Sequence, residues 1–247
     1  MGELNVENRV YNLDVAVVVA TLNEEVGVGP TLEEVKKVLF HPRLLVVDGN
    51  SVDRTVRIAK DLGSDVLFQK GRGKGRAMSQ GVRQLNGDTK YVVFTDADFT
   101  YPAEYIPKMI EILKHDDEIG MVIGNRFNKD HSFEDSMKSC FYIGNKSLAF
   151  AQRILNGVNL QDPLSGLRVV RSEILKDWKP RSKGFDIEAE LNHHIKRRGY
   201  KTLEISIEYR KRLGTKKLKG RQAFTIFKRI LFSSPSHYFG FLVDLMR

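Results

Sequence analysis

Two aspartates one residue apart, Asp96 and Asp98, form the pair whose chemistry is easiest to state. They follow an apolar segment, residues 91–95, that is typical of a buried strand. Hard divalent cations such as Mg²⁺ or Mn²⁺ prefer carboxylate oxygens, above all when diphosphate oxygens complete the shell. The alternative is a pair of turn or helix-capping aspartates before the helix expected at residues 102–114.

A second polar segment, residues 48–55, follows a strand expected at residues 44–47. Asp48 could accept hydrogen bonds from a base or a ribose. Ser51 or Asp53 is well placed to cap the next helix. We therefore expect Asp53 to fix the loop and regard Asp48 as the better ligand candidate.

Residues 71–77 alternate small residues with cations, among them Lys74, and lead into a helix expected at residues 75–85. Glycines and cations at the start of a helix suit a phosphate, although this spacing matches neither a Walker A loop nor a dinucleotide-binding fingerprint. Further along, residues 162–166 read Asp-Pro-Leu-Ser-Gly, which is typical of a turn.

A helix expected at residues 185–198 carries two carboxylates and two histidines, which are residue types that can form a site. Glu188 and Glu190 lie two residues apart, so at most one of them should point toward a common ligand. His193 and His194 lack the spacing of metal ligands, and we expect them to be surface or packing residues.

The elements that must position these residues alternate in the first half of the chain. Strands are expected at residues 14–20, 44–47, 66–69, 91–95 and 121–124, and helices at residues 30–40, 53–62, 75–85 and 102–114. Such alternation predicts βαβ units and a mainly parallel sheet flanked by helices, an α/β fold. Because ligands gather at the carboxyl ends of strands in open α/β sheets, the candidate residues should converge at one edge.

The second half is less regular. We expect helices at residues 138–155 and 185–198, a strand at residues 202–209, a basic run and then an amphipathic tail. The predicted organisation is one domain at residues 1–222, followed by the tail at residues 223–247. Such a tail could lie on a membrane surface, or it could dock on the protein core or a second subunit.

Composition sets limits on the class of protein. The chain has 247 residues, 41% of them hydrophobic and 29% charged, which is typical of a folded globular domain. A single cysteine, Cys140, excludes an intrachain disulfide and favours a reducing, intracellular setting. No window approaches the ~18–20 consecutive apolar residues needed to cross a bilayer.

The net charge of +9 is unevenly distributed. Between Glu208 and Arg221 the chain carries a dense run of lysines and arginines. Such a run could serve nucleic acid, an anionic membrane surface, a phosphorylated substrate or simply a solvated face. The sequence lacks the aromatic platform or recognition-helix pattern of a nucleic-acid-binding protein, so we expect no nucleic-acid partner.

Taken together and in this order, the loops resemble the family-2 glycosyltransferases of GT-A fold. Within that family they look most like the polyprenyl- and dolichyl-phosphate hexosyltransferases, including the dolichol-phosphate mannose synthases and archaeal enzymes of N-glycosylation. The resemblance covers about residues 15–220 and rests on residues 20–25, 48–55, 73–75, 95–98, 124–127, 162–166, 184–190 and 217–220.

The resemblance implies an inverting transferase that moves a hexose or N-acetylhexosamine from a nucleotide sugar to dolichyl or polyprenyl phosphate. The nucleotide would contact Thr21, Asn23, Glu24, Asp48, Lys74 and Asp96, and Mg²⁺ or Mn²⁺ would bind Asp96 and Asp98. The acceptor phosphate would contact Arg126, Ser165, Arg212, Lys217 and Lys219. The residues expected to act in catalysis are Asp96, Asp98 and Arg126.

Two details of the resemblance refine the expectation. Dolichol-phosphate mannose synthases commonly carry a glutamine metal ligand two positions after the second aspartate, whereas this chain has Thr100. Residues 47–51, 73–75 and 185–188 look closer to archaeal enzymes that generally use UDP-sugars, so UDP-glucose or UDP-N-acetylglucosamine is favoured over GDP-mannose.

A phosphate acceptor also makes chemical sense of the residues. Its second pKa lies near ~6, so it is largely a dianion at neutral pH and needs cations rather than a general base. An enzyme of this kind would work peripherally at the cytoplasmic face of the membrane. The rival is a family-2 transferase acting on a soluble glycan or protein, for which Asp186, Glu188 or Glu190 could serve as base.

Overall fold

A computed structural model describes residues 10–11, 14–127, 140–215 and 222–233. Within them lie the strands β1 (Val10–Tyr11), β2 (Val15–Thr21), β3 (Leu39–Phe40), β4 (Arg43–Asp48), β5 (Asp65–Phe68), β6 (Tyr91–Asp96), β7 (Ile119–Asn125), β8 (Arg168–Arg171) and β9 (Lys201–Ser206). Strands β2, β4, β6 and β7 are buried along nearly their whole length, as their continuous apolar sequences require.

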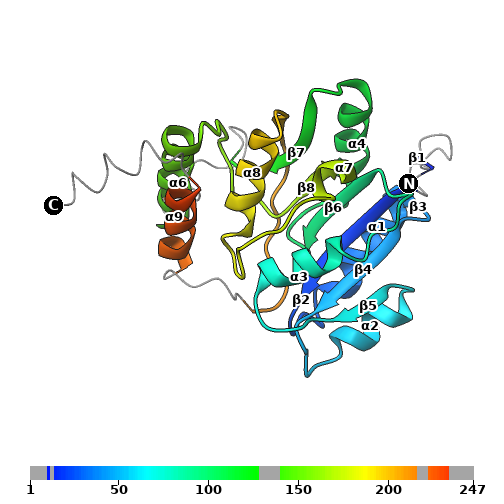
Figure 1. The fold of residues 1–247 in the computed structure, drawn as a ribbon. Helices are drawn as coiled ribbons and strands as arrows, with labels where there is room; N and C mark the ends of the chain where they lie inside the picture. The colour runs from blue at the N-terminus through cyan, green and yellow to red at the C-terminus, as the bar shows by residue number, and fades with distance from the viewer. Residues whose placement is uncertain (1–9, 12–13, 128–139, 216–221, 234–247) are drawn as a thin grey trace.

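Seven of these strands form one twisted sheet with the order β5-β4-β2-β6-β8-β7-β9 (Figure 1). All neighbours pair in parallel except β8, which runs antiparallel to both β6 and β7. The predicted parallel sheet is confirmed, but β8 was not predicted. Its sequence, Arg-Val-Val-Arg, is short and begins with a charge, so it carries a weak strand signal.

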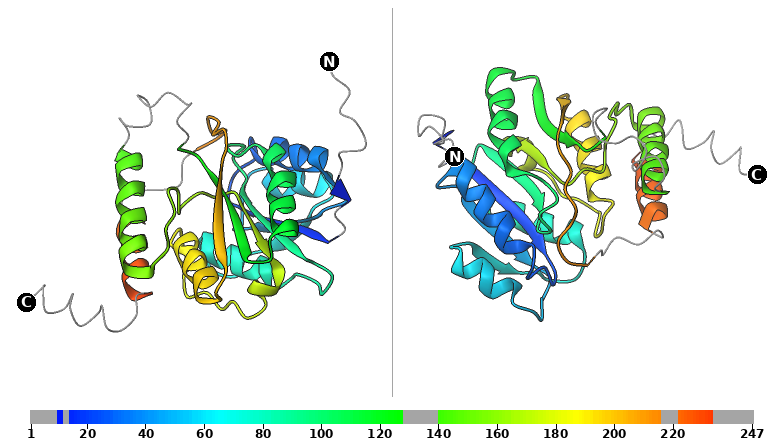
Figure 2. Two further views of the ribbon diagram at one scale, coloured as in Figure 1. Left: turned by 90° about the horizontal axis from the view of Figure 1, so that it is seen from above. Right: turned by 180° about the vertical axis from the view of Figure 1, so that it is seen from behind.

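Helices cover both faces of the sheet (Figures 1 and 2). The helices are α1 (Val28–Val38), α2 (Thr55–Asp61), α3 (Lys74–Val82), α4 (Ile106–His115), α6 (Cys140–Asn156), α7 (Ser172–Leu175), α8 (Ile187–Arg197) and α9 (Gln222–Phe232). Helices α1, α2 and α4 pack into the hydrophobic core on one face. On the other face, α3, α7 and α8 form a second core around Val18, Leu45 and Val47.

Several helix and strand boundaries in the structure differ from the predicted ones by a few residues. Helix α1 ends at Val38, and the next two residues form β3 paired with β1, where a continuous helix to residue 40 was predicted. The segment predicted as a helix from residue 102 begins as a 3₁₀ turn, Ala103–Tyr105, before α4. The predicted strand at residues 202–209 ends at Ser206 in β9.

Helices α6 and α9 lie side by side as an extra layer outside α8, as Figures 1 and 2 show. Ile226 and Ile230 of α9 are buried there against Leu148 of α6 and Ala189 of α8. This part of the tail therefore docks on the core through one face. No helix in the described part of the chain is long and apolar enough to cross a membrane.

Some expectations fall outside the described residues. They concern Lys217 and Lys219, the tail beyond residue 233 and the environment of the Cys140 side chain. The predicted boundary between residues 222 and 223 is not tested and stays a prediction.

Candidate active site

Four of the predicted site residues, Thr21, Asp48, Asp96 and Arg126, lie at the carboxyl ends of β2, β4, β6 and β7, as the fold class requires. Two glycines make the close packing around the aspartates possible. A Cβ atom on Gly27 would lie 2.4 Å from the carbonyl oxygen of Ala97, and one on Gly166 would lie 2.6 Å from Oδ2 of Asp96. The chain therefore needs glycine at both places so that the loops before α1 and before β8 can reach the Asp96–Asp98 turn.

Asp48 ends β4 and is completely buried. Its Oδ1 accepts hydrogen bonds from the hydroxyls of Thr21, at 2.9 Å, and Ser51, at 2.5 Å, and its Oδ2 accepts one from the backbone N–H of Ser51. Asp48 thus joins the loops after β2 and β4. A nucleotide would have to open this network to reach the carboxylate, so in this conformation the role of Asp48 is to hold the two loops together.

The loop after β2 is fastened to the loop after β4 by further polar contacts. Asn23 has a left-handed backbone with φ of 49°, and its side-chain oxygen accepts a hydrogen bond from Val52 N–H at 2.9 Å. Glu24 N–H donates to the hydroxyl of Thr55 at 2.8 Å. Asp53 accepts hydrogen bonds from both the backbone and the hydroxyl of Thr55, which confirms that it fixes the loop.

Asp96 shares a lysine with helix α8. Lys74 Nζ lies 2.6 Å from Oδ1 of Asp96 and 2.7 Å from Oε1 of Glu188. Burial alone would raise the pKa of Asp96, but the positive charges of Lys74, Arg126 and Arg212 outweigh it, so the pKa lies below its ordinary value. Burial alone would lower the pKa of Lys74, but the negative charges of Asp96 and Glu188 outweigh it, so the pKa lies above its ordinary value. The aspartate and the lysine are both ionised at neutral pH.

Asp98 is held on both of its oxygens. Thr100 donates two hydrogen bonds to Oδ1, from its hydroxyl at 2.6 Å and from its backbone N–H at 3.2 Å. Arg212 Nη2 lies 3.0 Å from Oδ2 and also 3.1 Å from Oε1 of Glu24. Thr100 thereby orients the aspartate. Residue Phe99 between them has φ of 64°, which turns the chain sharply at this point.

The donor set fits a hard divalent cation only in part. Oxygens of Asp98 and Glu24 converge on one guanidinium nitrogen, so they define a point that favours a cation. Among the described residues no group of three or more histidines, cysteines and acids could hold a metal ion. A metal here would need oxygens from water or from a ligand such as a diphosphate to complete its shell.

Arg126 follows β7 and is clamped by Asp162. Its Nε and Nη2 donate to the two carboxylate oxygens of Asp162, each at 2.7 Å, and its backbone N–H donates to Asp162 as well. Burial would lower the pKa of Arg126, but Asp162 raises it well above the ordinary value. Asp162 itself is completely buried, and Glu204 accepts its backbone N–H at 2.7 Å. The arginine is thereby fixed in place with a permanent charge.

Ser165 and Arg168 belong to the same loop and strand, and both are completely buried. Arg168 donates hydrogen bonds to the backbone oxygens of Ser165 and Pro163 and to the side chain of Asn192. It thereby ties residues 162–166 to helix α8. The sequence signal for this role is an arginine within the apolar residues 167–170, and the role was not predicted. Ser165 cannot meet a phosphate until this loop opens.

The carboxylates considered as possible bases are all engaged with cations. Asp186 lies 3.0 Å from Arg229, and Glu190 lies 3.6 Å from the same guanidinium while accepting the backbone N–H groups of residues 181 and 182. Only Glu188, through Lys74, points toward the aspartate pair, which confirms that at most one of Glu188 and Glu190 does so. His194 packs with Nε2 2.9 Å from the carbonyl oxygen of Ile174, as expected of a packing residue.

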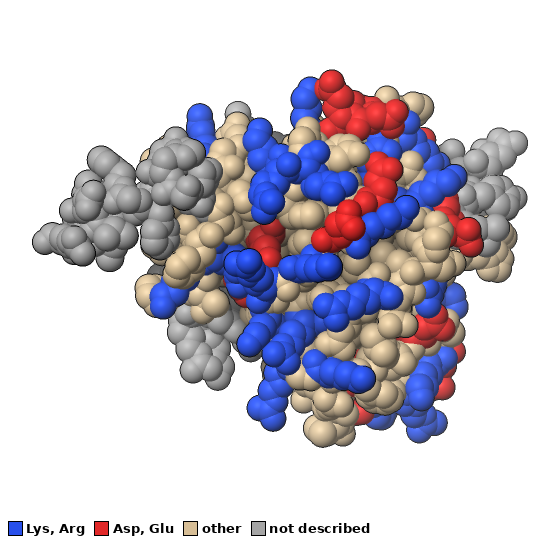
Figure 3. Space-filling model, viewed as in Figure 1, with Lys and Arg blue, Asp and Glu red and all other residues tan. Residues whose placement is uncertain are grey.

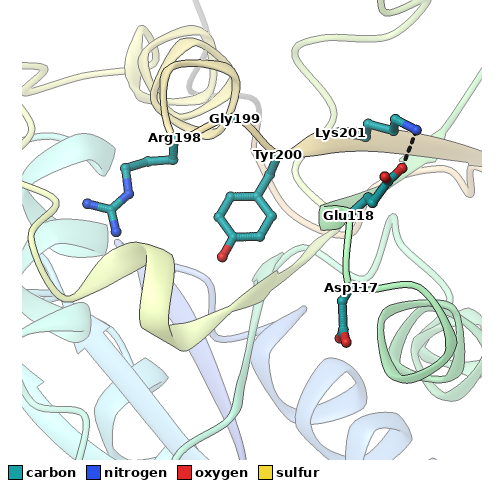
Figure 4. Close-up of a pocket in the computed structure, with 6 residues that line it drawn as sticks. All are labelled: Asp117, Glu118, Arg198, Gly199, Tyr200 and Lys201. Carbon is teal, nitrogen blue, oxygen red and sulfur yellow. Dashed lines mark hydrogen bonds and ion pairs between the residues drawn. The ribbon is translucent and has the colours of Figure 1, made fainter.

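The surface around α3 is strongly basic. Figure 3 shows lysine and arginine side chains gathered over this part of the face seen in Figure 1. A separate hollow of about 340 Å³, shown in Figure 4, lies at the opposite ends of the strands, where β7 and β9 begin. It is lined by surface residues such as Tyr200 and the exposed pair of Glu118 and Lys201, and it contains none of the predicted site residues.

The chain is similar in sequence to known proteins. The family model described as "Glycosyl transferase family 2" matches residues 16–179. A dolichyl-phosphate hexose transferase of Haloferax volcanii is 35% identical over 208 residues, which cover 83% of this chain and 86% of that protein. A dolichol-phosphate mannosyltransferase of Pyrococcus furiosus is 28% identical over 227 residues, which cover 88% of this chain and 63% of that protein.

The fold also matches solved structures. Glucosyl-3-phosphoglycerate synthase from Mycobacterium tuberculosis, in complex with Mg²⁺ and uridine diphosphate, superposes with a TM-score of 0.69 at 20% identity, covering 89% of this chain and 79% of that one. The predicted fold class is thereby confirmed. The chain belongs to glycosyl transferase family 2 and is a glycosyltransferase of GT-A fold, related to the dolichyl-phosphate hexose transferases.

Proposed function

We propose that the protein transfers a hexose or N-acetylhexosamine from a nucleotide sugar, preferably a UDP-sugar, to dolichyl or polyprenyl phosphate. The observation that carries this proposal is the clamped Arg126. Its guanidinium is fixed bidentately by Asp162, and its positive charge is among those that lower the pKa of Asp96. A fixed guanidinium is well suited to a phosphate acceptor.

The donor side would use the loops after β2, β4 and β6. We assign the nucleotide to Thr21, Asn23, Glu24, Asp48, Lys74 and Asp96. Mg²⁺ or Mn²⁺ bound by Asp98 and Asp96 would stabilise the charge on the departing diphosphate. The chain's own part is to orient these carboxylates, through Thr100 for Asp98 and through Lys74 for Asp96. Lys74 also places a positive charge where the diphosphate would lie.

The acceptor side would use Arg126, Arg212 and, once its loop opens, Ser165. Lys217 and Lys219, which lie outside the described residues, complete the assignment. These cations would place the phosphate dianion in line with the sugar C1, so that attack proceeds with inversion and without a general base. The relatives of Haloferax volcanii and Pyrococcus furiosus, whose names state transfer to a dolichyl phosphate or dolichol phosphate carrier, support this acceptor class.

The rival acceptor, a soluble glycan or protein hydroxyl, requires a general base. The three carboxylates considered for that role are Asp186, Glu188 and Glu190, and each is paired with Arg229 or Lys74. Each of these carboxylates would have to leave its cation to meet an acceptor hydroxyl. The site therefore favours an acceptor that is already ionised.

A lipid acceptor places the enzyme at a membrane, and we propose peripheral attachment at its cytoplasmic face. Helix α9 buries one side on the core and exposes Phe224, Phe227 and Phe232 on the other. Helix α6 exposes Ile143, Phe150 and Ile154, which are spaced so that they share one side of the helix. Apolar faces flanked by lysines suit the boundary between headgroups and acyl chains.

The test is a donor screen. The purified protein is incubated with dolichyl phosphate, Mg²⁺ or Mn²⁺, and in turn UDP-glucose, UDP-N-acetylglucosamine and GDP-mannose. We expect one UDP-sugar to give a lipid-linked sugar that is lost on chelation of the metal. Absence of a lipid product with every donor, together with transfer to a soluble glycan, would establish the rival function.

A further inference from the structure

Arg212 stands at the oxygen of Asp98 that a metal would use. Oδ1 of Asp98 already accepts two hydrogen bonds from Thr100. Oδ2 is the remaining oxygen, and it is the one that Arg212 Nη2 contacts at 3.0 Å, while the same nitrogen contacts Glu24 at 3.1 Å. Asp98 and Glu24 are each only 7% exposed. Coordination of a metal through this oxygen and the contact with Arg212 therefore compete.

The backbone that carries Arg212 is fastened on both sides of it. Leu213 N–H donates to the carbonyl oxygen of Asp98 at 2.9 Å, and Arg210 N–H donates to that of Thr100 at 3.0 Å. The Arg210 side chain is itself held by two hydrogen bonds to Glu34. Since the segment is anchored, the Arg212 side chain alone can leave the carboxylates without unfolding the loop. Its Nε has no hydrogen-bond partner among the described residues, so the guanidinium is incompletely satisfied where it is.

Charge decides which cation the carboxylates prefer. Arg212 brings a single positive charge to Asp98 and Glu24. A divalent cation at Oδ2 of Asp98 brings two positive charges and, at a few ångströms, repels the guanidinium. Arg126 Cζ lies 5.3 Å from the centre of the ring of Tyr209, which belongs to the same segment as Arg212, so a released Arg212 remains on a segment that contacts Arg126.

We propose that Arg212 is the resident counterion of the metal site and that metal binding transfers it to the acceptor phosphate. This inference rests on the proposed function and adds an order of binding to it, in which the metal binds before the acceptor phosphate. Before loading, Arg212 keeps Asp98 and Glu24 in place, and the acceptor site lacks one of its cations. When the metal arrives, the guanidinium becomes available to the phosphate, so the acceptor binds strongly only to the loaded enzyme.

The coupling is reciprocal, because a ligand that tightens the binding of a second ligand is itself bound more tightly, by the same factor, when the second ligand is present. Acceptor phosphate should therefore tighten metal binding, and metal should tighten phosphate binding. A residue with a merely structural role would instead weaken both when it is removed. The sign of the change in metal affinity separates the two cases.

The first measurement is Mn²⁺ binding in the absence of nucleotide, by calorimetry or electron paramagnetic resonance, to wild type, Arg212→Ala and Lys211→Ala. Lys211 is exposed and adjacent, so its replacement removes the same charge without touching the carboxylates. We expect Arg212→Ala to bind Mn²⁺ roughly tenfold more tightly, within the usual range of coupling between sites, and Lys211→Ala to match wild type. If Arg212→Ala unfolds, Arg212→Gln carries the same expectation.

The second measurement is the binding of farnesyl phosphate, a short polyprenyl phosphate, with and without Mn²⁺ and UDP. Wild type should bind it roughly tenfold more tightly in their presence, and Arg212→Ala should lose this enhancement. Unchanged or weaker Mn²⁺ binding by Arg212→Ala would overturn the counterion role whatever the substrate is. Tighter Mn²⁺ binding without any enhancement in wild type would overturn the transfer to phosphate. A lack of lipid product in the donor screen would count against the acceptor itself.

Discussion

Lys74 Nζ bridges Asp96 and Glu188, at 2.6 Å and 2.7 Å, and so joins the turn after β6 to helix α8. Arg212 bridges Asp98 and Glu24 in the same manner. Each aspartate of the pair thus shares one cation with a glutamate, on helix α8 for Asp96 and in the loop after β2 for Asp98. The two bridges hold four acidic side chains close together.

The first prediction concerns the stability supplied by Lys74. Replacement of Lys74 by Met leaves two carboxylates unpaired, of which Glu188 has a side chain only 5% exposed. We expect a loss of about 3 kcal/mol in the free energy of unfolding, the scale for breaking a buried ion pair. Urea denaturation measures it. Lys70→Met, at an exposed position, is the control, and Lys74→Met/Glu188→Gln should recover part of the loss. Equal midpoints for Lys74→Met and Lys70→Met would contradict the structure.

The second prediction concerns Asp98. The Asp98→Asn variant keeps the shape of the side chain and removes the charge that would bind the metal. Since a catalytic metal contributes several kcal/mol to transition-state stabilisation, kcat/KM should fall by more than about a hundredfold. Asp88→Asn, in an exposed loop, should retain full activity. Substantial turnover by Asp98→Asn at saturating Mn²⁺, with an intact fold by circular dichroism, would show that the metal assignment is wrong.

The third prediction separates acceptor from donor. In Asp162→Asn the clamp on Arg126 loses its charge and one of its acceptor oxygens. KM for the lipid phosphate should rise roughly tenfold, equivalent to about 1.4 kcal/mol, while KM for the nucleotide sugar stays the same. Steady-state kinetics with each substrate varied in turn measure this. Asp177→Asn removes an acid from a solvent-exposed pair and serves as control. If only the KM for the nucleotide sugar rose, Arg126 would serve the donor and not the lipid phosphate.

The fourth prediction is a pH dependence of stability. Burial lowers the pKa of His193 and of His194 below the ordinary value of 6.5, and the nearby Arg197 adds to the effect. A lowered pKa means that the unfolded chain binds protons more readily. The stability is therefore fully present above about pH 6.5 and falls as the pH drops below it. A His193→Gln/His194→Gln variant should lose less stability between pH 7.5 and pH 5. Parallel melting-temperature curves for the two proteins would refute this.

The fifth prediction tests the membrane face. Phe224→Gln/Phe227→Gln should bind vesicles of phosphatidylglycerol and phosphatidylcholine at least about tenfold more weakly, because it removes apolar area that would enter the interface. Co-sedimentation measures binding. Leu203→Gln changes a residue of similar exposure on β9, 40% against 42% for Phe227, and should bind like wild type. Equal binding by all three proteins would exclude α9 as the attachment surface.

The fold was largely predictable because its parallel strands carry continuous apolar sequences and alternate with amphipathic helices. The convergence of Thr21, Asp48, Asp96 and Arg126 at one edge followed from that alternation alone. What could not be predicted was β8, because its first residue is an arginine that is buried with a partner far along the chain, the side chain of Asn192 on helix α8. The order of apolar and polar residues along the chain does not specify such distant partners.

The internal pairing of the site was equally out of reach. The sequence indicates that Lys74 and Arg212 are cations near loops that suit phosphate, but not that each lies on an aspartate of the pair. Nor does it reveal that Asp48 and Ser165 are completely enclosed. These contacts depend on the exact packing of loops that are distant in the chain, which no local pattern encodes.

The antiparallel strand β8 also bears on the order of folding. Strands β2, β4, β5 and β6 follow one another closely in the chain, so this half of the sheet can assemble from short-range contacts. Tyr91 of β6 and Met121 of β7 instead pair with Arg171 and Val170, far along the chain. The other half must wait for that long connection to close. During synthesis, the chain should therefore form the half to which we assign the nucleotide before it forms the loop to which we assign the acceptor phosphate.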